Sequence, residues 1–135
     1  MMFMREIKVK TNKRQEMVDI TNEIEKIVED EKLENGLVTI YAPHTTAAVT
    51  INEGADPDVQ RDIIKHMEKI VPERGGYKHM EGNSDAHIKS SIIGPSETII
   101  VSNGKLVLGT WQHIFFFEGD GPRTRKVDVE IFEKK

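Results

Sequence analysis

The chain has 135 residues and no cysteine, and its 23 acidic and 19 basic residues give a net charge of -4 at pH 7. The lack of cysteine excludes disulfides, thiolate zinc sites, iron-sulfur clusters and cysteine nucleophiles. Charges of both signs are mixed along the chain, so no nucleic-acid partner is expected. No apolar run approaches the roughly 20 residues of a membrane span, and the charged N-terminus is not a signal peptide. We therefore expect one cytoplasmic globular domain over residues 1–135, without a membrane partner.

Strand patterns occur at both ends of the chain. Near the N-terminus, apolar and charged residues alternate with the period of two that is typical of a half-buried strand. Later segments are rich in β-branched residues or flank Asn103-Gly104, the strongest short hairpin signal. The predicted strands are residues 3–10, 37–42, 45–52, 87–93, 97–101, 105–109, 110–118 and 126–132.

Two segments have helical spacing of their apolar residues. The first extends from Asn12 to a stop at Asn35-Gly36, with Asn12 and Gln15 as a capping box. The second begins at Asp56-Pro57, where an N-cap residue is followed by proline at the first helical position. Two helices and about seven or eight strands, mostly antiparallel because their connections are short, predict an α+β fold.

Three histidines lie where predicted elements begin or end. His44 follows a proline between two predicted strands, while His79 and His87 flank a Gly-Asn-Ser-Asp turn. Three histidines with a fourth open position suit catalytic zinc, and imidazoles without thiolates also suit nickel or copper. The sequence therefore predicts a divalent metal site, with zinc as the expected ion. The alternative is that each histidine is an ordinary surface or structural residue. The chain has no HxH or HExxH pair, so the spacing of the histidines does not by itself specify a metal site.

Two carboxylates lie close to these histidines in the sequence. Glu53 ends the strand that begins after His44, and Asp85 lies two residues before His87. A carboxylate beside an imidazole can orient the ring or act as a general base near a metal-bound water. The alternative is that Asp85 caps its turn and Glu53 is solvated.

The string EGDGPR, residues 118–123, is the most unusual local pattern. Its glycines permit close backbone approach and its proline stiffens the exit, so that Arg123 presents a planar fork suited to phosphate or carboxylate. Nearby hydroxyl and amide groups add donors for an anion. The alternative is an ordinary Gly-Pro turn with a surface arginine. The predicted substrate-binding residues are Thr45, Thr46, Asn83, Ser84, Asp120 and Arg123.

Four longer strings carry a family resemblance. They are HTTAAVTINEGADPDV, HMEGNSDAHIKSSIIG, GKLVLGTWQHIFFFEGDGPR and RKVDVEIF. From about residue 5 to residue 132 the chain resembles the YjbQ family, often labelled secondary thiamine-phosphate synthase. The resemblance implies two packed sheets with two helices and assembly as a homotrimer. It places the family's proposed metal and active site at His44, His79 and His87, and its E.DGPR motif at Glu118, Asp120 and Arg123.

The resemblance implies a reaction as well. Thiamine-phosphate synthesis joins an aminopyrimidine diphosphate to a thiazole phosphate and releases pyrophosphate, normally with magnesium. The expected function is thus a metal-dependent enzyme acting on a small phosphorylated or anionic substrate, with magnesium if the synthase reaction is native and zinc otherwise. Its metal ligands are the three histidines, its proton carriers Glu53 or Asp85, and its anion-binding residue Arg123. The alternative is a trimeric metal- or metabolite-binding protein without catalysis, in which the apolar run 114–117 meets the core on one face and a helix or a neighbouring subunit on the other.

Overall fold

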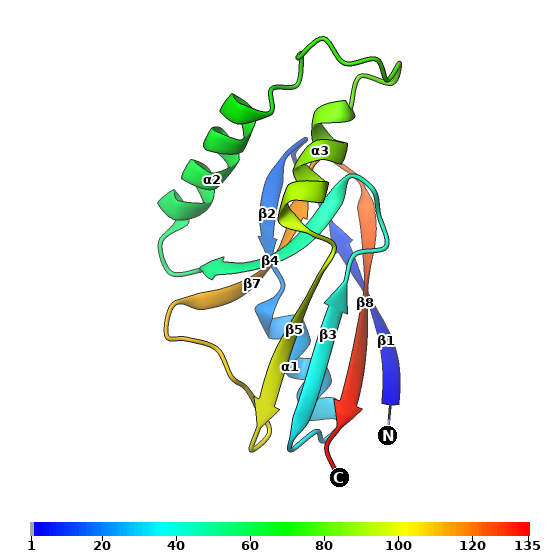
Figure 1. Ribbon diagram of the computed structural model, residues 1–135. Coiled ribbons are helices and arrows are strands. Elements are labelled where there is room, and N and C mark those ends of the chain that lie inside the picture. The colour runs from blue at the N-terminus through cyan, green and yellow to red at the C-terminus, as the bar shows by residue number, and fades with distance from the viewer. Residues whose placement is uncertain (1) are drawn as a thin grey trace.

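Two antiparallel sheets form the frame of the molecule (Figure 1). The computed structural model describes the backbone of residues 2–135 and the side chains from residue 4 onward. The larger sheet has the strand order β1-β8-β3-β5-β6, and the smaller has the order β2-β7-β4. This arrangement confirms the predicted α+β fold with two packed sheets. Within residues 2–135 the elements are β1 (Met2–Lys10), β2 (Glu16–Asp19), α1 (Thr21–Asp30), β3 (Gly36–Tyr41), β4 (Ala47–Glu53), α2 (Pro57–Ile70), α3 (Ser84–Ile93), β5 (Ser96–Ser102), β6 (Lys105–Leu106), β7 (Gln112–Glu118) and β8 (Thr124–Glu133).

The first predicted helix begins nine residues too early. The segment from Asn12 does not cap a helix, because β2 occupies residues 16–19 and α1 begins only at Thr21. Met17 has helical spacing with Ile20 and Ile24, yet it pairs with Phe117 of β7, and the neighbouring Val18 pairs with Phe116. Pairing with a distant strand has overridden the local pattern here, as tertiary contacts commonly do.

A third helix replaces the strand predicted at 87–93. Residues 84–93 form α3, whose isoleucines Ile88 and Ile92 are exposed while Asp85 and Lys89 are completely buried. Because polar side chains occupy its inner face, α3 has no apolar stripe from which a helix is predicted. Its β-branched isoleucines instead favour a strand locally.

The core has two layers. The larger one lies between the sheets and includes Ile24 and Val28 of α1 together with the inward residues of both sheets. The smaller one lies on the other face of the three-stranded sheet, where Phe115 and Phe117 are buried and α2 and α3 pack (Figure 1). The run 114–117 therefore buries large side chains on both faces of β7, one against the core and one against helices, as the sequence predicts.

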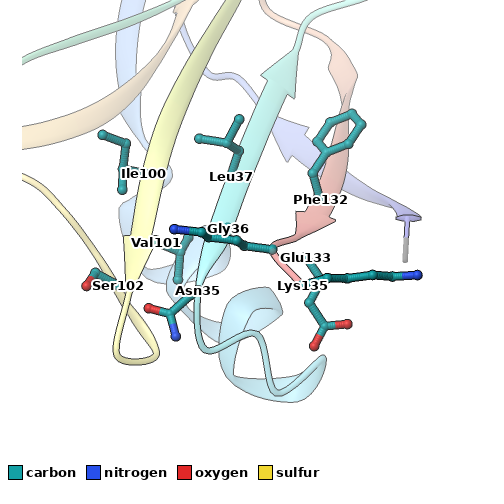
Figure 2. A pocket seen from close by; sticks show the side chains of 10 residues that line it. Asn35, Gly36, Leu37, Ile100, Val101, Ser102, Phe132, Glu133 and Lys135 are labelled. Carbon is teal, nitrogen blue, oxygen red and sulfur yellow. The ribbon is translucent and has the colours of Figure 1, made fainter.

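The outward face of the five-stranded sheet carries a row of apolar side chains. Leu37 of β3 is directly opposite both Ile100 of β5 and Phe132 of β8. All three are substantially exposed, and Figure 2 shows them side by side along a groove of about 750 Å³. Among the described residues, no helix is both long and apolar enough to cross a membrane.

Candidate functional site

Several chain segments meet at one end of the two sheets, at the top of Figure 1. The turn after β3, the start of β4, the link from β7 to β8 and the beginning of α3 together enclose a polar pocket of about 730 Å³. A volume of this order suits a small metabolite. The pocket is lined by Tyr41, Pro43, His44, Thr45, Thr46, His79, Glu81, Asn83, His87, Asp120, Arg123 and Arg125. It collects titratable groups, whereas the outward groove of similar size is lined largely by apolar side chains and backbone, so we regard the polar pocket as the site.

The three predicted histidines all line this pocket. The rings of His79 and His87 meet edge to face with their centroids 5.4 Å apart. The ring of His44 packs edge to face on Phe116, and its Nε2 lies 2.8 Å from the carbonyl oxygen of Lys126. Burial lowers the pKa of His44, because it disfavours the charged ring. His44 is thus a neutral ring at neutral pH, and its Nε2 also lies 3.2 Å from the backbone nitrogen of Lys126, so both polar backbone groups of Lys126 hold the ring in place.

The three predicted metal ligands do not meet at one point. Among residues 2–135, no three His, Asp or Glu side chains are grouped closely enough to hold an ion together. The ring centroids of His79 and His87 are 5.4 Å apart, which is similar to the separation of about 5 Å for two imidazoles bound to one ion at about 2.0–2.1 Å. Zinc therefore stays a prediction, with two of its three histidine ligands brought together.

Asp85 lies under the pocket rather than in it. Its buried carboxylate accepts hydrogen bonds from both terminal nitrogens of Arg14 at 2.9 and 3.1 Å, from Gln15 at 3.1 Å and from Lys89 at 2.9 Å. Burial alone would raise the pKa of Asp85, but the hydrogen bonds from Arg14 and Lys89 outweigh it and lower the pKa. The carboxylate is committed to these ion pairs, so its predicted roles as general base or ring-orienting group have no place in the pocket.

Two further predicted residues also lie outside the pocket. Glu53 ends β4, and its Oε2 accepts the backbone N–H groups of Ala55 at 2.7 Å and Asp56 at 3.2 Å. A seven-residue strand is about 20 Å long, so Glu53 is that far from the pocket end of β4. Ser84 lines a neighbouring hollow together with Gly82. The structure does not bring either residue to the predicted anion cradle.

Asp120 and Arg123 form the part of EGDGPR that faces the pocket. Nε of Arg123 donates to the carbonyl oxygen of Asp120 at 3.0 Å, and Nη2 donates to its carboxylate at 3.1 Å. The same carboxylate accepts from the amide of Asn83 at 2.9 Å. Asp120 therefore links the arginine on one side of the pocket to the start of α3 on the other. Nη1 of Arg123 has no hydrogen-bond partner within residues 2–135.

Sequence reasoning missed Arg125. This buried residue of β8 donates from Nε to both carboxylate oxygens of Glu118, at 2.9 and 3.1 Å, and from Nη2 to the hydroxyl of Thr46 at 2.8 Å. Thr11 also donates to Glu118 at 2.8 Å. Burial would raise the pKa of Glu118, but the hydrogen bond from Arg125 and further donors lower it. The missed signal is positional, because Arg125 precedes Val127 on the inward face of its strand, where a charge is unexpected.

Comparison with known proteins places this architecture in a family. The family described as "UPF0047 protein YjbQ-like" matches residues 5–134. The chain belongs to this family. It is 54% identical to a UPF0047 protein of Methanocaldococcus jannaschii, over 94% of this chain and 92% of that protein. It is 50% identical to the UPF0047 protein YugU of Bacillus subtilis, over 96% of this chain and 98% of that protein.

Solved structures of UPF0047 proteins agree closely with the fold. A YjbQ/UPF0047 family protein of Clostridium acetobutylicum superposes with a TM-score of 0.93 at 52% identity, covering 95% of this chain and 99% of the other. A protein of Sulfolobus solfataricus, described as YbjQ-like and of unknown function, superposes with a TM-score of 0.95 at 36% identity, covering 99% of each chain. The fold of this chain is therefore that of its UPF0047 relatives.

These comparisons correct the predicted function. The relatives are named only as UPF0047 proteins, and the structures are described as uncharacterised or of unknown function. None of these descriptions names thiamine-phosphate synthase, a transferase or a metal-dependent reaction. The expectation of a metal-dependent enzyme that makes thiamine phosphate is therefore wrong, and the alternative, a binding protein without catalysis, agrees better with the UPF0047 relatives.

Proposed function

We propose that the chain is a cytoplasmic binding protein that holds a small anionic metabolite in the polar pocket without transforming it. The observation that carries the proposal is the state of Arg123. Asp120 fixes its guanidinium through Nε and Nη2, while Nη1 has no partner among the described residues. An arginine held in this way presents a charged donor in a set direction, which is how proteins recognise carboxylates and phosphates. The exposed hydroxyl of Thr45 on the same pocket adds a second donor.

The positions of the carboxylates support binding over catalysis. A general base must lie within hydrogen-bond reach of the proton that it removes. Asp85 is committed to Arg14 and Lys89, and Glu53 caps the turn before α2. Neither of the two predicted proton carriers therefore reaches a ligand in the pocket. The hydrogen-bond donors that would bind an anion remain there.

A second candidate function is the binding of a divalent metal, and the ring geometry of His79 and His87 favours it. The two rings have the separation that a shared zinc ion produces. The ion would contribute positive charge to the pocket and so strengthen the hold on an anion. No catalytic step is assigned to it.

We also propose that the chain assembles as a homotrimer, as the family resemblance implies. The exposed row of Leu37, Ile100 and Phe132 supports an interface on the outward sheet face. On the same sheet, Oδ1 of Asp128 is buried and has no hydrogen-bond partner in the part of the chain that the structure describes. A donor from a neighbouring subunit would satisfy this oxygen.

Replacing Arg123 tests the binding function. We expect calorimetric titration with acetate, succinate, citrate and inorganic phosphate to detect binding of at least one anion by the unmodified protein. Arg123→Gln should weaken that binding about tenfold, since it removes a charged hydrogen bond. Arg61→Gln is the matched control, because Arg61 makes a comparable i,i+3 ion pair with Asp58 on α2 and lies outside the pocket.

Two results would contradict the proposal. One is that none of the four anions binds, and the other is that Arg123→Gln binds them as tightly as the unmodified protein. NMR spectra of the bound anion after prolonged incubation should show it unchanged. A new product that forms only in the presence of the protein would contradict binding without catalysis.

A further inference from the structure

The deepest charged group of the pocket is the guanidinium of Arg125. The residue is only 5% exposed, yet it lines the pocket. Its Nε and Nη2 are occupied by Glu118 and Thr46. Nη1 has no hydrogen-bond partner in residues 2–135. It is also absent from the polar atoms that are both unpartnered and fully enclosed, so Nη1 is accessible from outside the protein. The one part of Arg125 that is not bonded is thus the part that opens into the pocket.

We propose that Arg125 anchors the ligand through Nη1, and that the group it binds is a carboxylate. This inference rests on the proposed function, since it names the anchoring residue and the ligand class of the same pocket. A buried guanidinium with unused N–H donors gains more binding free energy from an acceptor than an exposed guanidinium does. The reason is that little water competes for the buried donors. Glu118 and Thr46 hold the fork rigid, so the acceptor is bound in a fixed orientation.

The charges that face the pocket favour a carboxylate over a phosphate. Arg123 and Arg125 contribute two positive charges, while Glu81 and Asp120 in the lining and Glu118 behind Arg125 contribute three negative ones. His44 is neutral because burial lowers its pKa. The surroundings are therefore not strongly positive, and they oppose the second negative charge of a phosphate more than the single charge of a carboxylate. The two arginines provide N–H donors in fixed orientations rather than a large net positive charge. Such donors suit the planar, two-oxygen carboxylate group.

Titrations followed by NMR on the unmodified protein test the anchor directly. The Nε–H of Arg125 is buried and hydrogen-bonded, so its proton–nitrogen signal is expected to be visible near neutral pH. Acetate and inorganic phosphate are added separately at pH 7.5 and constant ionic strength. We expect acetate to shift the Arg125 signal to saturation, and phosphate at the same concentration to shift it less.

The outcomes separate this inference from the proposed function. If acetate shifts the signals of Arg123 and His87 but not that of Arg125, the anchor is overturned while anion binding stands. If phosphate shifts the Arg125 signal more than acetate, the carboxylate class is overturned. If neither anion shifts any pocket signal, the inference fails, and the proposed function fails with it only if succinate and citrate also do not bind in the calorimetric titration.

A paired substitution tests the anchor without stranding a buried charge. Arg125→Met combined with Glu118→Met removes both members of the ion pair, and such replacements commonly preserve the fold. We expect this variant to lose acetate affinity by about tenfold or more. Arg5→Met combined with Glu31→Met removes an ion pair away from the pocket and should leave acetate affinity unchanged. Equal acetate affinity in the two folded double variants would overturn the anchor.

Discussion

The histidines that face each other in the pocket carry the metal prediction at the scale of single residues. His79 and His87 have the ring separation of two ligands on one ion. We expect the protein to bind zinc, and His87→Ala to weaken zinc binding by at least about tenfold, since even the loss of groups behind the ligands costs 10–100-fold. Competition against a zinc-chelating dye at pH 7.5 measures this. His66→Ala is the control, because His66 is exposed on α2, and equal zinc affinity in all three proteins would rule out the pair as ligands.

Single residues differ in how far the sequence could reveal them. His44 and Arg123 are found because a neighbouring proline marks a constrained turn. Asp85 lies two residues before His87 in the sequence, but a helix directs residues two positions apart to different sides, and the predicted strand concealed this. Arg125 lies one residue before the predicted strand 126–132, so the alternation of that strand does not reveal that it faces inward. The sequence therefore predicts the pocket residues that lie in turns, such as His44 and Arg123, but not the buried residues beneath them, such as Arg125.

At the scale of elements, α3 is unusual because charged groups rather than an apolar stripe hold it in place. Asp85 bonds to Lys89 one turn later, and Lys89 reaches Glu68 of α2 at 2.8 Å. We expect Asp85→Ala to lower the free energy of unfolding by about 3–5 kcal/mol, because it leaves Lys89 buried beside Arg14 without its main counter-charge. Urea denaturation at pH 7 measures the loss. Asp85→Ala combined with Lys89→Met should recover much of it, and a single variant as stable as the unmodified protein would contradict this account.

The same helix should respond to acid. Hydrogen bonds from Arg14 and Lys89 lower the pKa of Asp85 from its ordinary value of 3.8, so below that pH the unfolded chain binds the proton more readily than the folded one. The stabilisation by Asp85 is therefore complete above about pH 4 and is lost as the pH falls through the folded pKa. Stability measured between pH 7 and pH 2 should decline less steeply for Asp85→Ala than for the unmodified protein.

The elements also show where local signals suffice. The start of α2 is predicted correctly because Asp56 accepts from the backbone N–H of Asp58 and proline occupies the first turn, both of which are local. β2 could not be predicted, since four residues form a strand there only because β7 lies beside them. α3 was misassigned because its buried face is polar.

At the scale of the whole molecule, the uncovered sheet face predicts how copies of the chain associate. We expect light scattering to give the mass of a trimer for the unmodified protein. Ile100→Lys should reduce that mass, because a charge then enters the apolar row beside Leu37. Ile70→Lys is the matched control, since Ile70 is equally exposed but lies at the end of α2. A monomeric mass for the unmodified protein would contradict the assembly.

The α+β class was predictable from the strand and helix patterns, whereas the two packed sheets were expected only from the family resemblance, because strands far apart in the chain, such as β1 and β8, pair in them. What local patterns did not specify is that the β2, β7 and β4 strands form their own sheet with helices on the outer side. The chemistry was the least predictable, since the same histidines and arginine suit either binding or catalysis, and their positions in the sequence do not distinguish the two.

The pair of Arg125 and Glu118 has a consequence for how a ligand enters. Both side chains are almost fully buried and bonded to Thr11 or Thr46 before any ligand arrives. Their conformational entropy is therefore lost during folding and not during association. The opposite rim is different, because His79 belongs to the long loop between α2 and α3. Whatever ordering accompanies binding should be confined to that rim, so the floor acts as a rigid template to which the loop adapts.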